Sequence, residues 1–174
     1  METMVSTSAM LPKKILIGLD GSTGSARALA WAIELAKALK AEIVAVHVVE
    51  LLTPSALGLG LAPVQLPDDW VADLRHRFED EWTAPLKQAG LRYRTVFETG
   101  APAPALIATA REEHPDLIVT GSRGLGGFGE LLLGSVSHQL VLHAQMPVVV
   151  IPPEPKKATL TAQTPSELAS VAAP

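Results

Sequence analysis

Short apolar segments alternate with segments of helical periodicity along most of the chain, and this alternation restricts the fold to one class. Apolar runs of this length, rich in β-branched residues, are typical of strands buried on both faces of a sheet. Strands separated by helices pair in parallel, because the helix carries the chain back across the sheet. The sequence therefore predicts an α/β fold, with an open, doubly wound sheet of five parallel strands and helices on both faces. The predicted strands cover residues 15–19, 42–49, 91–98, 116–120 and 148–151.

The predicted helices carry apolar residues three and four positions apart, which places one apolar face against the sheet. Pro85 follows the second helix and is expected to end or kink it, because proline removes a helical hydrogen bond. The strand at 91–98 has only one plainly apolar face, which predicts an outer position in the sheet. The helical patterns cover residues 29–39, 71–82, 103–113 and 133–141.

Length and composition indicate one folded domain between two tails. With 174 residues and 48% hydrophobic side chains, the chain can bury a single full-sized core. We expect the domain to span residues 13–151, with a flexible N-terminal tail at 1–12 and a disordered C-terminal tail at 152–174. The uncharged stretch 51–67 contains three prolines and two glycines, which predicts a long loop inside the domain.

Charge, cysteine content and hydropathy exclude several kinds of partner. A net charge of −4 without a basic run argues against nucleic acid, and the absence of cysteine excludes disulfides and thiolate metal sites. Residues 1–12 lack the basic start of a secretory signal. Pro147 divides the uncharged stretch 131–153 into a helix and a strand, so we do not interpret it as a membrane span. We therefore expect a cytoplasmic protein with no membrane partner.

Small and polar residues follow two of the predicted strands. Asp20 follows the first strand and the glycine-rich segment 121–129 follows the fourth. Ligands of open α/β sheets bind beyond the carboxyl ends of strands, so we expect these two segments to face one crevice. The start of the next helix, 134–137, offers free N–H groups and hydroxyls to a phosphate. Asp20 either accepts from ribose hydroxyls or holds a metal ion through water, or else only stabilises its turn or caps the following helix.

The glycines after the fourth strand follow a specific pattern of G, two residues, G, nine residues, G, then Ser or Thr. The four matching positions are Gly121, Gly124, Gly134 and Ser135. This pattern resembles the nucleotide-binding signature of the universal stress protein family. The segments 18–22 (GLDGS) and 47–48 (HV) support the resemblance, which extends over residues 13–151. The resemblance implies a Rossmann-like sheet with strand order 3-2-1-4-5.

The family resemblance also implies an adenine-nucleotide site that takes ATP with Mg²⁺. By this resemblance, Asp20 contacts the ribose, the Val48 backbone meets the adenine, and Gly121 lies under the ribose. Arg123 occupies a position that the family does not fix, and it either adds positive charge near the phosphates or is a solvated surface side chain. A homodimer through the last strands of two subunits, Val148–Ile151, is implied as well. The remaining matching positions would hold the phosphates: Gly124, Gly134, Ser135, Val136 and Ser137.

Other motifs give weaker indications of chemistry. Residues 124–129 match GxGxxG, but they follow the fourth strand, and no acidic residue ends the next one, so a dinucleotide site is not favoured. His47 is expected to be a hydrogen-bonded core residue. His138 and His143 are five positions apart, a spacing that does not place two metal ligands on one helix face. The tryptophans are expected in the core or at an interface rather than against a cofactor. They are Trp31, Trp70 and Trp82.

These observations predict an ATP-binding stress or signalling module whose nucleotide occupancy alters its shape or its choice of partner. No catalytic residue is assigned, because no motif supplies a phosphate-binding lysine, a carboxylate base or a hydrolytic triad. A slow ATPase or phosphoryl-transfer enzyme that uses the same crevice is one alternative. An ATP-independent scaffold or chaperone, in which the glycine segment is a structural turn, is another.

Overall fold

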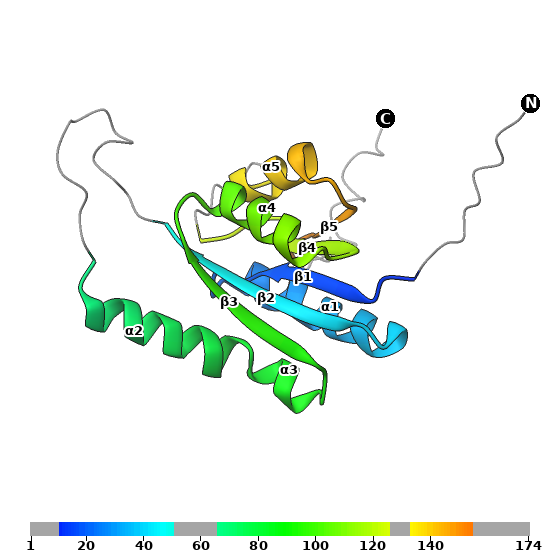
Figure 1. The fold of residues 1–174 in the computed structure, drawn as a ribbon, viewed down its shortest axis with the longest axis horizontal. Helices are drawn as coiled ribbons and strands as arrows, with labels where there is room; N and C mark the ends of the chain where they lie inside the picture. The colour runs from blue at the N-terminus through cyan, green and yellow to red at the C-terminus, as the bar shows by residue number, and fades with distance from the viewer. Residues whose placement is uncertain (1–10, 51–65, 126–132, 155–174) are drawn as a thin grey trace, which may run out of the picture.

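A computed structural model describes residues 11–50, 66–125 and 133–154. At its centre is one parallel sheet of five strands in the order β3-β2-β1-β4-β5 (Figure 1). This order confirms the predicted fold class and strand order. Most of the two predicted tails, most of the predicted loop at 51–67 and residues 126–129 lie outside the described residues. The strands are β1 (Lys14–Gly18), β2 (Glu42–Val49), β3 (Tyr93–Thr99), β4 (Leu117–Gly121) and β5 (Val148–Ile151).

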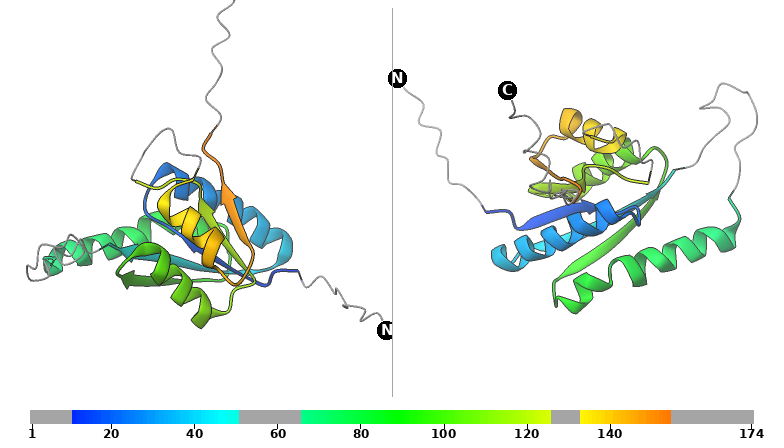
Figure 2. Two further views of the ribbon diagram at one scale, coloured as in Figure 1. Left: turned by 90° about the horizontal axis from the view of Figure 1, so that it is seen from above. Right: turned by 180° about the vertical axis from the view of Figure 1, so that it is seen from behind.

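Helices cover both faces of the sheet. The right-hand view of Figure 2 shows α1 and α2 on one side of the sheet and α5 on the other. The predicted helix at 71–82 consists of two segments, because the α-helical backbone changes to π-helical at Arg77. Pro85 then lies in the first turn of a new short helix, which agrees with the expected break in the helix. The helical segments are α1 (Thr23–Leu39), α2 (Asp68–His76), the π-helical η1 (Arg77–Trp82), α3 (Ala84–Gln88), α4 (Pro102–Glu113) and α5 (Ser135–His143).

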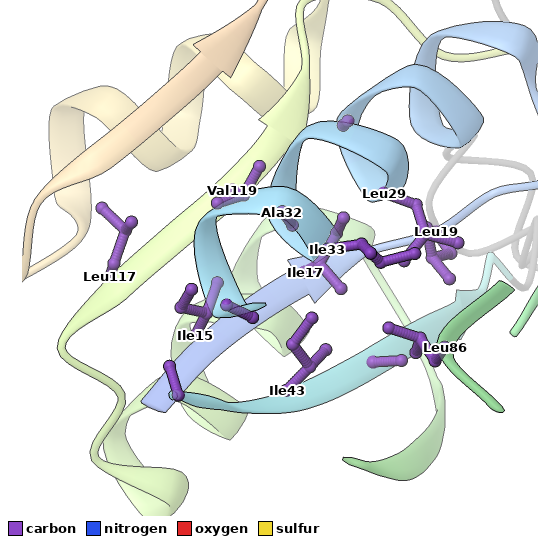
Figure 3. Close-up of a cluster of buried hydrophobic side chains, with 14 of the residues drawn as sticks. Ile15, Ile17, Leu19, Leu29, Ala32, Ile33, Ile43, Leu86, Leu117 and Val119 are labelled. Atoms are coloured by element: carbon purple, nitrogen blue, oxygen red, sulfur yellow. The ribbon is translucent and has the colours of Figure 1, made fainter. Parts of the chain in front are cut away.

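Two apolar clusters, one on each face, hold the layers together. Ile15 and Ile17 of β1 point toward α1 and α3, where Figure 3 shows them packed with Leu29, Ile33 and Leu86. Leu16, between them in the sequence, packs on the opposite face with α4 and α5. Each fully buried Ile or Leu side chain contributes about 1.5–3 kcal/mol relative to an exposed one, so the central strands anchor the fold.

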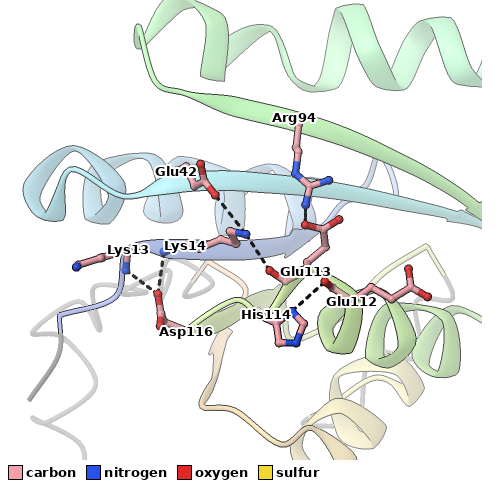
Figure 4. Close-up of polar contacts among 8 residues, drawn as sticks. All are labelled: Lys13, Lys14, Glu42, Arg94, Glu112, Glu113, His114 and Asp116. Atoms are coloured by element: carbon pink, nitrogen blue, oxygen red, sulfur yellow. Dashed lines mark hydrogen bonds and ion pairs between the residues drawn. The ribbon is translucent and has the colours of Figure 1, made fainter.

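Polar contacts join the strands at their amino ends. Asp116 accepts hydrogen bonds from the backbone N–H groups of Lys13 and Lys14, at 2.8 and 3.0 Å (Figure 4). Arg94 forms an ion pair with Glu113 nearby. These contacts stabilise the edge of the sheet at which the strands begin.

No helix in the described ranges combines the length and the apolar character that a bilayer crossing requires.

Candidate functional site

A cavity of about 690 Å³ opens at the carboxyl ends of β1, β2 and β4. Cavities of this size commonly hold small-molecule ligands. The sequence positions singled out from the nucleotide-binding pattern all line it, although they come from four separate segments of the chain. They are Asp20, Val48, Gly121, Arg123, Gly124, Gly134, Ser135, Val136 and Ser137.

Asp20 joins two of these segments. Its Oδ1 accepts a hydrogen bond from the Ser22 backbone N–H at 2.9 Å, which stabilises the turn after β1. Its Oδ2 accepts from the backbone N–H of Leu125 at 3.1 Å. The helix cap is a different residue, because Ser22 Oγ accepts from the Ser25 N–H at 3.1 Å. Asp20 therefore organises the turn and the glycine segment but does not cap α1.

Two glycines of the pattern allow very close approaches between segments. A Cβ atom at Gly121 would lie 2.8 Å from the backbone carbon of Gly24, at the start of α1. A Cβ atom at Gly124 would lie 2.3 Å from Asp20 Oδ2. The first contact shows that Gly121 is needed for backbone packing. The second shows that Gly124 is needed to admit the Asp20 carboxylate.

The N-terminus of α5 contributes backbone N–H groups to the cavity. Gly134 is the N-cap residue and offers no side chain, so the first N–H groups of the helix have no side-chain acceptor. The Ser137 hydroxyl is buried and donates to the carbonyls of Ser122 and Gly134, at 2.9 and 3.0 Å. Ser137 thus fixes the turn before α5, and its hydroxyl is engaged within the protein.

The sequence analysis missed the wall that α2 and η1 form on one side of the cavity. Trp70, Leu74, Arg77 and Trp82 line this side. Trp70 is 47% exposed and Trp31 is 40% exposed, so neither lies in the core. The spacing of 70, 74 and 77 places these residues on one helix face, which is the signal that could have identified the wall.

His47 is buried beside the cavity, as predicted. The residue is 7% exposed, and its Nδ1 donates to the Leu19 carbonyl at 2.7 Å. The rings of Phe78, Trp82 and Phe97 surround it, with centroids 5.1–5.7 Å away. Burial lowers the pKa of His47 below 6.5, while the Leu19 carbonyl and the charge of Asp20 oppose this shift. His47 is therefore held as a neutral core residue that steadies the chain just before Asp20.

The site contains charges of both signs. Asp20 and Glu50 contribute carboxylates, and Arg77 and Arg123 contribute guanidinium groups. Arg77 lies over the ring of Trp82, with 5.8 Å between its Cζ and the ring centroid. Within the described ranges, no three His, Cys, Asp or Glu side chains are grouped as metal ligands.

Comparison with known proteins places the chain in a family. A family model described as the universal stress protein family matches residues 12–152. Universal stress protein YxiE of Bacillus subtilis is 34% identical over 148 residues, covering 79% of this chain and 97% of the relative. Universal stress protein MJ0531 of Methanocaldococcus jannaschii is 31% identical over 161 residues, covering 90% of this chain and 91% of the relative.

Solved structures show the same architecture. A crystal structure of a universal stress protein in complex with cAMP is 27% identical, with a TM-score of 0.57. The match covers 81% of this chain and 97% of that one. Since the matching family model spans most of the sequence and includes every cavity position of the glycine pattern, the chain belongs to the universal stress protein family.

Proposed function

We propose that this protein binds ATP in the cavity at the carboxyl edge of the sheet and acts as a nucleotide-dependent stress or signalling module. The observation that carries the proposal is the convergence of all the positions of the pattern on one cavity. A universal stress protein of 27% identity in complex with cAMP supports an adenine nucleotide as the ligand. ATP is abundant in the cytoplasm, and we propose that the module works there.

The nucleoside end of the ligand is assigned to the ends of β1, β2 and β4. The Asp20 carboxylate accepts one hydrogen bond at each oxygen from the protein, and each oxygen retains a second lone pair for a ribose hydroxyl. Val48 lines the cavity near the end of β2, where its backbone would meet the base edge. Gly121 is buried beneath this region and would lie under the ribose.

The phosphates are assigned to the glycine segment and α5. The N-terminus of α5 carries a partial positive charge and N–H groups without a side-chain cap, both of which favour an anion. Ser135 and Val136 line the cavity at this point, and Arg123 adds a positive charge to its wall. Because the Ser137 hydroxyl donates to Ser122 and Gly134, we assign to Ser137 a backbone N–H rather than a hydroxyl contact.

The donor set also fits Mg²⁺ bound together with ATP. Mg²⁺ in nucleotide sites is held by phosphate oxygens, water and one or two carboxylates. The Asp20 carboxylate accepts from the Leu125 N–H in the glycine segment and would hold the ion through water. The ion would neutralise phosphate charge when bound.

We further propose that two copies pair through β5. This strand is at the end of the sheet order, and pairing would satisfy its open backbone groups. Exposed apolar side chains on α5 are available to extend such an interface. They are Val141 and Leu142.

Denaturing the purified protein and identifying any released nucleotide would test the proposed ligand, followed by calorimetric titration of the stripped protein with ATP and Mg²⁺. We expect one ATP per chain and little conversion to ADP. Rapid ADP formation would instead favour a phosphoryl-transfer enzyme. No adenine-nucleotide binding would leave the glycine segment as a structural turn and favour a scaffold.

A further inference from the structure

The first turns of α2 extend beyond the sheet. Figure 1 and both views of Figure 2 show α2 starting outside the carboxyl ends of β2 and β3. None of its side chains is buried, whereas α1 buries six. Among the described residues, no helix or strand buries this part of α2, which leaves its apolar face available for contact with a ligand.

The inward face of α2 is turned toward the cavity. Trp70, Leu74 and Arg77 all line the cavity, as do Val48 and Glu50 at the end of β2. The base end of the nucleotide, assigned above to the Val48 backbone, therefore lies in the same hollow as the Trp70 indole. A backbone contact reads the edge of a base and leaves its two faces without a partner.

Trp70 and Trp82 differ in how their rings are used. Trp82 packs against Gly21, where a Cβ atom would come within 2.5 Å of the indole, and lies edge-on to His47 with centroids 5.1 Å apart. The Arg77 guanidinium lies over the Trp82 ring. In the described part of the chain, Trp70 makes no ring contact of this kind and is 47% exposed. Trp70 therefore offers an aromatic face in the cavity wall that no other described ring or guanidinium group covers.

We propose that Trp70 on α2 is the stacking surface for the purine base of the bound nucleotide. This inference rests on the proposed function and adds to it a residue that fixes the base rather than the ribose or phosphates. An indole offers a broad, rigid face, and base–aromatic stacking accepts any purine. Stacking would also connect nucleotide occupancy to α2, a helix with no buried side chain.

Calorimetric titration with ATP tests this role in the full-length protein. Trp70→Ala is expected to weaken ATP binding by about 5- to 150-fold, the range that loss of one base–aromatic stack produces. Trp70→Phe, which retains a smaller ring, should fall between Trp70→Ala and the wild type. Trp31→Ala is the matched control, because Trp31 is similarly exposed on α1 but does not line the cavity. The Trp31→Ala variant should bind ATP with an affinity within twofold of the wild type.

A fluorescence measurement separates stacking from a structural effect. ATP should quench the tryptophan emission of the wild type and of Trp31→Phe, and most of this quenching should be lost in Trp70→Phe. Tripolyphosphate, which has no base, should quench none of them. ATP affinity within twofold of wild type in Trp70→Ala, or unchanged quenching in Trp70→Phe, would overturn the inference while leaving the proposed function intact. If the wild type binds no ATP, the proposed function and this inference are both wrong.

Discussion

Asp20 and Leu125, 105 positions apart in the sequence, are joined by a hydrogen bond of 3.1 Å from the Leu125 backbone N–H to the Asp20 carboxylate. The bond connects the turn after β1 to the glycine segment after β4. It passes through the space that a side chain at Gly124 would fill. The same carboxylate proposed to bind ribose thus also holds the segment proposed to bind phosphate, which couples the two parts of the site.

We expect Asp20→Asn to weaken ATP binding roughly tenfold to a hundredfold, because hydrogen bonds to a charged acceptor contribute about 1.5–3 kcal/mol. Asp116→Asn is the matched control. Asp116 also accepts backbone N–H groups across the sheet, but at the opposite edge. Both variants should lose stability to urea, and only Asp20→Asn should lose affinity in calorimetry. Equal loss of affinity in the two would show that Asp20 acts only through the fold.

The glycines of the pattern should differ in their effect on stability. Gly121→Ala would force a Cβ to within 2.8 Å of the Gly24 backbone, which cannot rotate away, so we expect a loss of about 1–3 kcal/mol. Gly134→Ala meets only ordinary contacts at 3.4 Å or more and should change stability by less than about 1 kcal/mol. Urea denaturation of both variants measures this. A similar loss in both would mean that Gly134 also serves packing.

The sequence was sufficient to predict the parallel sheet, and to predict that the segments lining the site meet at one edge of it. The reason is physical. Parallel strands joined by helices bring all their carboxyl ends to one edge, so residues that follow β1 and β4 must meet there. The glycine spacing then identifies which backbone segments come close. Asp20 and Gly124 were therefore predictable from the pattern, even though the atoms they contact were not.

Other features depend on tertiary contacts that periodicity does not encode. The apolar spacing at 71–82 fits an α-helix. In the structure, however, the Thr83 N–H donates to the carbonyl of Phe78, five residues back, which is the hydrogen bond of a π-helical turn. The sequence predicts Trp70 in the core or at an interface. It does not lie in the core, because the start of α2 extends past the sheet and Trp70 stays 47% exposed. The Ser137 hydroxyl was expected to face phosphate, but the Ser122 carbonyl takes its hydrogen bond.

The burial of His47 predicts a specific pH dependence of stability. Its pKa is lowered in the folded protein by burial, with the Leu19 carbonyl and Asp20 opposing the shift. The unfolded chain therefore binds a proton more readily than the folded one. This contribution to stability is complete above pH 6.5 and declines as the pH falls from 6.5 toward the lowered value.

Urea denaturation at pH 7.5, 6.5 and 5.5 would measure this decline in the wild type and in His47→Gln. The glutamine retains a donor for the Leu19 carbonyl but does not titrate. The rings that face His47 are uncharged. The charge of Asp20 acts on His47, and Arg75 and Arg77 lie over the neighbouring rings of Phe97 and Trp82. We expect a shallower decline in His47→Gln. If the free energy of unfolding falls equally with pH in the two proteins, His47 is not responsible for the decline.

The open edge of β5 provides a test of the proposed dimer. The carbonyls of Pro147 and Ile151 accept hydrogen bonds from β4, so by the alternation along a strand the backbone groups of Val148 and Val150 point to the open side. Val150→Pro would remove one open-edge donor without breaking a bond to β4, and Val150→Thr keeps that donor. In analytical ultracentrifugation at micromolar concentration, we expect two chains for the wild type and Val150→Thr, and one chain for Val150→Pro. A wild-type mass of one chain would rule out the dimer, and a dimeric Val150→Pro would place the interface elsewhere.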